Sequence, residues 1–272
     1  MCTSGMCTDA GGFVPGGLTF GSLPLRTMKS LKNVKMPDAV QASFSLKRTA
    51  ALLGNEGMER LQLAHVLLVG VGAVGGACAE ALARSGVGKL TLVDGDVFDV
   101  TNLNRQPFSA VSAVGHEKTV VTCQRLADIA PHCRAEGKSC FVTPENVSAL
   151  IQEIAPDVIV DAIDDVAAKV ALLFAAVQYR LPVWSAMGAA RKLDPLALRI
   201  TDISKTQVCP LARNVRQQLR RMGIEKGIRC VWSSEVAAPL HDGTLGSYMP
   251  VTASAGLLLA AEVVRYLTDK GK

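Results

Sequence analysis

The chain has 272 residues, of which 49% are hydrophobic and only 4% aromatic, and its formal net charge is +5. This length allows one large domain with a substantial core, and the abundant Ala, Val and Leu favour helices packed on a parallel sheet over an all-β fold. The eight cysteines include no C-x-x-C pair and no secretory signal is apparent, which argues against a disulfide framework and a four-cysteine zinc site. The longest apolar run, 253–261, is too short to cross a bilayer. We therefore expect a cytoplasmic protein without a membrane partner.

The N-terminal segment differs in composition from the rest. Residues 1–43 are rich in Gly, Ser, Thr and Pro and lack hydrophobic periodicity, which predicts a flexible extension. Its basic residues also allow a transit peptide. A further interpretation is that the start codon is assigned too far upstream and that translation begins at Met28 or Met36. We expect a nucleotide-binding α/β domain over 44–190 and, over 191–272, a C-terminal extension of the same domain that faces substrate or RNA.

A strand, a glycine turn and a helix form the first strong pattern. The aliphatic run 65–69 leads into Gly70-x-Gly72-x-x-Gly75, and an Ala-rich helical run follows over 77–84. In such a fingerprint Gly70 permits the turn, Gly72 lets backbone approach a phosphate, and Gly75 lets the helix pack on the strand. A nucleotide site is therefore predicted at this turn.

The remaining patterns alternate between strand and helix. They predict strands over 90–94, 135–142, 157–161 and 182–186, and helices over 46–63, 117–129, 166–179 and, briefly, after Pro144. Beyond Gly188 they predict half-exposed strands over 198–203 and 228–232, an amphipathic helix over 211–222 and a buried helix over 253–267. Because alternation of this kind implies right-handed parallel crossovers, we predict an α/β, Rossmann-like, doubly wound, mostly parallel sheet with a C-terminal antiparallel extension.

Polar residues follow the strand ends of the predicted sheet. Asp94 ends a strand 24 residues after Gly70, where a carboxylate can hold a ribose hydroxyl. Arg105 and Lys118 follow near the same edge, and their charges suit a triphosphate undergoing displacement better than the diphosphate of a dinucleotide. Asp164 comes after the strand 157–161, where it could hold Mg²⁺ or only cap the next helix. These groups could bring the α-phosphate of ATP to a carboxylate, which is adenylation.

These residues belong to motifs that resemble those of a known enzyme family. The motifs are Gly70-x-Gly72-x-x-Gly75, Asp94-x-Asp96, Asn102-x-Asn104-Arg105-Gln106, Gly115-x-x-Lys118 and Asp161-x-x-Asp164. In order and spacing they resemble the ubiquitin-activating-type adenylating enzymes, which also activate sulfur-carrier proteins. The resemblance implies that Asp94 binds ribose, that Asp96 and Asn104 belong to the ATP site, that Arg48 and Lys118 contact phosphates, and that Asp164 serves the metal-bound nucleotide. It also implies a homodimer in which Arg105 is delivered across the interface.

Within this superfamily the chain is most similar to the tRNA threonylcarbamoyladenosine dehydratases. The similarity lies in 83–92, 143–146, 161–164, 185–189, 192–195 and 205–212. It implies adenylation of the threonylcarbamoyl carboxylate on an adenosine beside the tRNA anticodon, and then ring closure that expels AMP. The alternatives are an activator of a ubiquitin-like sulfur carrier, a non-catalytic nucleotide-binding scaffold and a dinucleotide oxidoreductase.

Departures from the family patterns bear on these alternatives. The N-terminal motif usually has two arginines, whereas Ser45-Leu46-Lys47-Arg48 keeps only the second. Asp165 stands where sulfur-carrier activators usually have Asn, and the missing C-x-x-C pairs also count against those activators.

Positive charge is concentrated in the C-terminal half. Residues 191–230 hold ten Lys or Arg against three acidic residues. Arg213, Arg216 and Arg220 form one stripe of the helix over 211–222, which is either a solvated face or a tRNA contact.

Two cysteines are candidates for a reactive thiol. Cys230 alternates with apolar residues, as a core residue would. Cys209 precedes a helix start and is the better candidate for sulfur or thioester chemistry, which leaves a cysteine-desulfurase or sulfur-acceptor partner open.

Overall fold

The computed structural model describes residues 45–240 and 242–269. Within them, seven strands form one sheet in the order β3-β2-β1-β4-β5-β7-β6. Every pairing is parallel except that of β6 with β7. The predicted fold class is therefore confirmed, including the antiparallel pair near the C-terminus. The extension predicted over 1–43 lies outside the described residues.

The elements follow the predicted order. The strands are β1 (His65–Val69), β2 (Lys89–Val93), β3 (Arg134–Lys138), β4 (Val158–Asp161), β5 (Val183–Ala186), β6 (Leu198–Asp202) and β7 (Arg229–Ser233). The α-helices are α2 (Lys47–Leu63), α3 (Ala73–Ser85), α4 (Lys118–Ile129), α5 (Val147–Ile154), α6 (Val166–Gln178), α7 (Pro210–Arg221) and α8 (Met249–Thr268).

Two of the boundaries that differ from the prediction have a clear cause. The strand expected over 135–142 ends at Lys138, because its partner β2 ends at Val93, which pairs with Lys138. The last helix begins at Met249 rather than Ala253. Its first turn contains Pro250, and proline fits there because its missing N–H would have no partner within the helix.

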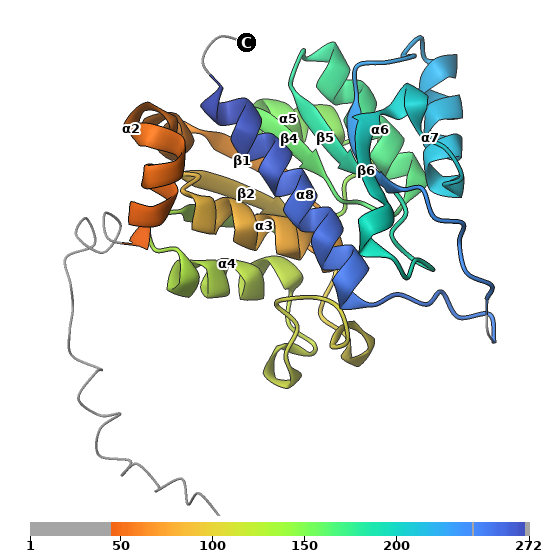
Figure 1. Cartoon of the computed structure of the whole chain (residues 1–272), viewed down its shortest axis with the longest axis horizontal. Coiled ribbons are helices and arrows are strands. Elements are labelled where there is room, and N and C mark those ends of the chain that lie inside the picture. Colours follow the sequence, from red (N-terminus) through yellow and green to blue (C-terminus); the bar gives the residue numbers. More distant parts are fainter. Residues whose placement is uncertain (1–44, 241, 270–272) are drawn as a thin grey trace, which may run out of the picture. The chain divides into compact units, whose positions relative to one another are not determined.

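Helices cover both faces of the sheet (Figure 1). One core lies beneath α2, α3, α4 and α8 and includes Leu82, Leu90 and Leu259. The other lies beneath α5, α6 and α7 and includes Leu172 and Leu219. These layers leave the carboxyl ends of the parallel strands uncovered by helix, and ligands bind at that edge in sheets of this type.

The C-terminal helix α8 explains the longest apolar run in the chain. By length and composition it could cross a membrane, with a mean hydropathy of 1.3. However, Val251, Leu259 and Val263 on α8 are buried, and a Cβ on Gly256 would lie 2.3 Å from the carbonyl oxygen of Val74 in α3. Packing at this distance accounts for the small and apolar residues of α8.

Candidate active site at the carboxyl edge of the sheet

A cavity of about 870 Å³ opens at the carboxyl ends of the parallel strands. This volume falls in the range of roughly 300–1,000 Å³ that is usual for small-molecule sites. Of the predicted site residues, the cavity is lined by Gly70, Gly72, Asp94, Asp96, Arg105, Lys118, Asp164 and Cys209. The structure thus brings together groups from six separate stretches of sequence, and Gly75 lies just behind them in α3.

The glycine turn has the conformation that its spacing predicts. Gly70 has a φ of 89°, and its N–H donates to the carbonyl oxygen of Val93 at 2.8 Å. A Cβ on Gly75 would lie 1.8 Å from the carbonyl oxygen of Gly70, so only glycine lets α3 pack this closely. Gly72 caps α3, and around its Cβ position the nearest atom is the Gln106 Nε2, at 3.8 Å. The free N–H groups at the start of α3 can therefore receive a phosphate.

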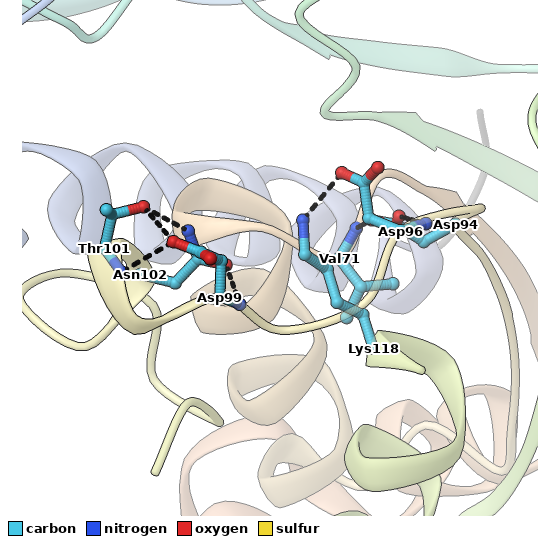
Figure 2. Close-up of polar contacts among 7 residues, drawn as sticks. All are labelled: Val71, Asp94, Asp96, Asp99, Thr101, Asn102 and Lys118. Atoms are coloured by element: carbon cyan, nitrogen blue, oxygen red, sulfur yellow. Dashed lines mark hydrogen bonds and ion pairs between the residues drawn. The ribbon is translucent and has the colours of Figure 1, made fainter. Parts of the chain in front are cut away.

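Asp94 is held rigidly beside this turn. The backbone N–H of Val71 donates to its Oδ2 at 2.7 Å, and the backbone N–H of Asp96 donates to its Oδ1 at 2.9 Å (Figure 2). A carboxylate offers about four acceptor sites, so each oxygen can still accept a further hydrogen bond. Asp94 is thus fixed and available for a ribose hydroxyl.

Lys118, the first residue of α4, is positioned by Asp96. Its Nζ donates to the Asp96 Oδ2 at 2.8 Å, and its backbone N–H donates to the Asp96 carbonyl at 3.0 Å. The lysine is only 6% exposed, so the carboxylate offsets the cost of burying its ammonium. In this structure Asp96 therefore orients the lysine, and the ammonium remains at the cavity wall for a phosphate.

Arg105 lines the cavity of its own chain. Its Nη1 donates to the carbonyl oxygen of Thr101 at 2.8 Å and to the Asn104 Oδ1 at 3.0 Å. The preceding turn is fixed by a capping box in which Asp99 and Asn102 exchange hydrogen bonds (Figure 2). Arg105 can therefore reach a nucleotide in the same chain, so we expect it to act within its own chain rather than across the dimer interface that the family resemblance implies.

Asn104 has a different place from the one expected. It does not line the cavity, and its Nδ2 donates to the backbone carbonyl of Ser247 at 2.9 Å. The segments 234–240 and 242–248, which together we call the strap, contribute Ala237, Leu245 and Ser247 to the cavity wall. Asn104 thus connects the Asn-x-Asn-Arg-Gln motif to the strap.

Asp165, and not Asp164, caps helix α6. The Asp165 carboxylate caps α6 by accepting from the N–H of Ala168 at 2.8 Å. Asp164 is exposed, lines the cavity and has no polar partner among the described residues. Residues 45–240 and 242–269 contain no cluster of three metal-ligating side chains. A lone free carboxylate beside a phosphate site nevertheless fits Mg²⁺, which is commonly held by one or two carboxylates together with substrate phosphates.

A buried ion pair lies behind Asp164 and was not anticipated. The Lys169 Nζ donates to the Asp161 Oδ2 at 2.6 Å and to the carbonyl oxygen of Ala186 at 2.9 Å. The Ser185 hydroxyl donates to the same carboxylate oxygen at 2.6 Å. This network joins the ends of β4 and β5, from which the cavity-lining segments continue. The signal in the sequence is a single lysine in the otherwise apolar helix 166–178.

Two further cavity residues were missed. Gln106 is buried and its Oε1 has no hydrogen-bond partner in the structure, so it can accept from a ligand. The Phe141 side chain is 64% exposed, and its ring lies so close to Gly95 that a Cβ there would be 2.6 Å from it. An exposed aromatic ring beside Asp94 offers a flat apolar surface for a base.

Of three further candidates, two lie outside the cavity. Arg48 is exposed near the start of α2 and does not line the cavity. Cys230 is fully buried in β7, and burial raises its pKa to about 12, so the structure does not support a reactive thiol there. Cys209 is also buried but does line the cavity, and its Sγ caps α7 by accepting from the N–H of Ala212 at 3.5 Å.

The arginine stripe on α7 divides into two kinds of residue. Arg213 and Arg220 are exposed. Arg216 is partly buried, and its Nη1 donates to the carbonyl oxygen and the hydroxyl of Thr206, the first of these at 2.9 Å. Arg216 therefore holds the segment before α7 in place, and two of the three predicted RNA contacts remain free.

The fold and the cavity place this chain in a known class. Residues 45–272 match the model of the ThiF family, and the chain belongs to that family. The tRNA threonylcarbamoyladenosine dehydratase of Bacillus subtilis is 42% identical over 188 residues, which cover 69% of this chain and 74% of the relative.

Solved structures agree with this assignment. Those of the Escherichia coli tRNA N6-threonylcarbamoyladenosine dehydratase in complex with AMP and with ATP are 34% identical to this chain, with TM-scores of 0.80 and 0.79. Each match covers 83% of this chain and 94% of the solved one. The resemblance inferred from the sequence motifs is confirmed.

Proposed function

We propose that this chain catalyses the ATP-dependent adenylation and cyclising dehydration of threonylcarbamoyladenosine in tRNA. The observation that carries the proposal is a single cavity holding an open helix N-terminus, a fixed carboxylate, an arginine and a lysine, in a chain similar to dehydratases of this name. The cavity supplies binding groups for every part of ATP.

The nucleotide would bind with its base toward Phe141 and its ribose hydroxyls on Asp94. The start of α3, with Lys118 and Arg105, would receive the phosphates and stabilise the charge that develops as pyrophosphate leaves. Asp164 would hold Mg²⁺ together with the phosphates, where the ion neutralises their charge.

The reaction needs two displacements. In the first, an oxygen of the threonylcarbamoyl carboxylate attacks the α-phosphorus of ATP, and pyrophosphate leaves. In the second, a nitrogen or oxygen of the carbamoyl group attacks the acyl carbon, the ring closes with loss of one proton from that group, and AMP leaves with the carboxylate oxygen. The net change in the nucleoside is loss of one water, and no protein nucleophile is required.

The partners follow from this reaction. The substrate is a tRNA, which the exposed Arg213 and Arg220 would contact through its phosphates. We also propose that the chain works as a cytoplasmic homodimer. Cys209 is the one observation that favours a second function, activation of a sulfur carrier, because its thiol lies at the cavity wall.

Pyrophosphate release with defined acceptors tests the proposal. The chain is incubated with ATP and Mg²⁺ and, separately, with tRNA bearing threonylcarbamoyladenosine, the same tRNA without the modification, or a sulfur-carrier protein with a C-terminal glycine. Release that depends on the modified tRNA supports the proposal. Release with the sulfur carrier alone would replace it by the second function.

A further inference from the structure

Two cationic residues form a part of the cavity wall that the nucleotide site does not use. Arg191 and Lys192 follow β5 and line the cavity together with the glycine turn. No role in binding ATP follows from their position. Both are held by the strap, and the contacts of each differ from those of an ordinary surface cation.

Arg191 has an unusual backbone and a partly free side chain. Its φ of 61° lies in the left-handed region, which residues with a side chain rarely adopt and which clusters at functional sites. Its N–H donates to the Gly246 carbonyl at 2.8 Å, its carbonyl accepts from the Ala238 N–H at 2.8 Å, and its Nε donates to the Ala238 carbonyl at 2.5 Å. Its terminal nitrogens have no partner among the described residues. The strap therefore fixes an arginine whose outer fork is left for a ligand.

Lys192 is a buried cation without a counter-charge. It is 3% exposed, and its Nζ donates to the backbone carbonyl of Glu235. The Glu235 carboxylate instead accepts from the backbone N–H groups of Leu193 and Asp194, each at 3.0 Å. Among the described residues, neither Arg191 nor Lys192 forms an ion pair. Burying an uncompensated ammonium is costly, so the cavity at this point favours an anion.

The order of the strands shows which anion this is. The phosphate site follows β1, whereas Arg191 follows β5, two strands along the order β1-β4-β5. Strands lie roughly 4.8 Å apart, so the ends of β1 and β5, from which the two segments continue, are separated by roughly 10 Å at the sheet edge. This separation favours an anion of the second substrate over the phosphates beside the glycine turn. Resting on the proposed function, we propose that Arg191 and Lys192 form the subsite for the threonylcarbamoyl carboxylate.

The chemistry of both partners fits this subsite. The fork of an arginine matches a carboxylate in a bidentate contact, and the bonds gain from the opposite charges. The subsite also answers a problem of the reaction, because a carboxylate must approach a triphosphate of the same sign. Cations on the acceptor side offset that repulsion, and they distinguish tRNA with the modification from tRNA without it.

Binding to two forms of one tRNA tests the subsite. In the absence of ATP, the full chain is titrated with tRNA bearing threonylcarbamoyladenosine and with the same tRNA bearing adenosine. We expect the wild type to prefer the modified form by about tenfold, the usual order for a charge-assisted contact, and Arg191→Asn to bind both equally. Asn tolerates a positive φ, so the variant should fold, with a melting temperature lowered only by loss of the Nε bond to Ala238. Lys192→Gln should also reduce the preference for modified over unmodified tRNA.

A matched control and a second measurement make the result decisive. Lys226→Asn removes the same charge from an exposed residue outside the cavity, and it should keep the tenfold preference. In turnover, Arg191→Asn should raise the KM for modified tRNA about tenfold while the KM for ATP stays unchanged. If Arg191→Asn keeps the preference, or weakens ATP binding instead, the subsite is overturned although the wild type forms product. If the wild type forms no product from modified tRNA, the proposed function fails as well.

Discussion

Asp164 and Asp165 are neighbours at the start of α6, yet only the Asp165 carboxylate caps the helix, by accepting from the N–H of Ala168 at 2.8 Å. Both residues line the cavity, but the Asp165 carboxylate is engaged by the helix whereas the Asp164 carboxylate has no polar partner among the described residues. The two adjacent acids thus have separate roles, which mutations can distinguish.

Exchanging each aspartate should give opposite phenotypes. Asp164→Asn should lower turnover at least about a hundredfold, because a charged ligand of the metal-bound nucleotide is lost, while the free energy of unfolding stays unchanged. Asp165→Ala should lower the free energy of unfolding by about 1 kcal/mol through loss of the cap and keep most of the activity. Urea titration and pyrophosphate release measure both effects. A stable, fully active Asp164→Asn variant would show that the Asp164 carboxylate has no role in turnover.

Arg105→Ala should lower turnover by about two to three orders of magnitude without unfolding the chain, as expected for a cation that stabilises developing phosphate charge. The loss should appear in kcat more than in the KM for ATP. Unchanged turnover in this variant would show that the guanidinium serves the fold alone.

Mixing variants decides which chain supplies Arg105. If the arginine crosses a dimer interface, Arg105→Ala mixed with Asp164→Ala forms sites that contain both native residues, and activity returns. Because Arg105 lines the cavity of its own chain, we expect no return. Wild type mixed with a doubly substituted chain serves as the control for subunit exchange. Recovered activity would favour the delivery in trans that the family resemblance implies.

The ion pair of Lys169 with Asp161 should be necessary for folding. Lys169→Met leaves the Asp161 carboxylate buried without its cation, and the free energy of unfolding should fall by about 3–5 kcal/mol. Adding Asp161→Asn removes the uncompensated charge and should restore part of the loss, as a double-mutant cycle measured with urea would show. Additive losses would mean that the two residues act independently.

The arginines of α7 should separate RNA binding from stability. Replacing Arg213 and Arg220 by Gln should weaken tRNA binding and reduce the slope of log K against log salt by about two, because each phosphate contact contributes roughly 0.9. Arg216→Gln should instead lower the melting temperature, because its bonds to Thr206 are lost. An unchanged slope in the double variant would contradict the RNA contact.

Much of the fold and of the cavity was predictable, because it depends on local patterns in the sequence. Hydrophobic runs, the glycine spacing and the Asn-x-Asn-Arg-Gln motif depend on neighbours in the chain, and they predicted the sheet and much of the cavity. The pairing of Asp161 with Lys169 depends on how α6 packs against the end of β4, although the two residues are only eight positions apart, and the anchoring of Arg191 depends on Ala238, 47 positions further along the chain. Asn104 shows the same limit, since its bond to Ser247 joins residues 143 positions apart.

The exposure of side chains was the other unpredictable part. Arg213 and Arg216 occupy one predicted stripe, but only the structure shows that Arg216 is held by Thr206. Cys209 and Cys230, by contrast, were separable from the sequence, because alternation predicted a core position for Cys230 and the helix start favoured Cys209, and Cys230 is buried in the core whereas Cys209 lines the cavity. Periodicity predicts which face of a helix or strand a residue occupies, whereas the residue that its side chain contacts is determined by the tertiary structure.

The most direct test of the proposed function is mass spectrometry of nucleosides from tRNA bearing threonylcarbamoyladenosine, after incubation with this chain, ATP and Mg²⁺. We predict that the nucleoside loses one water, that the loss requires ATP, and that it is abolished in Arg105→Ala. An unchanged nucleoside, in the presence of a chain that still binds ATP, would contradict it.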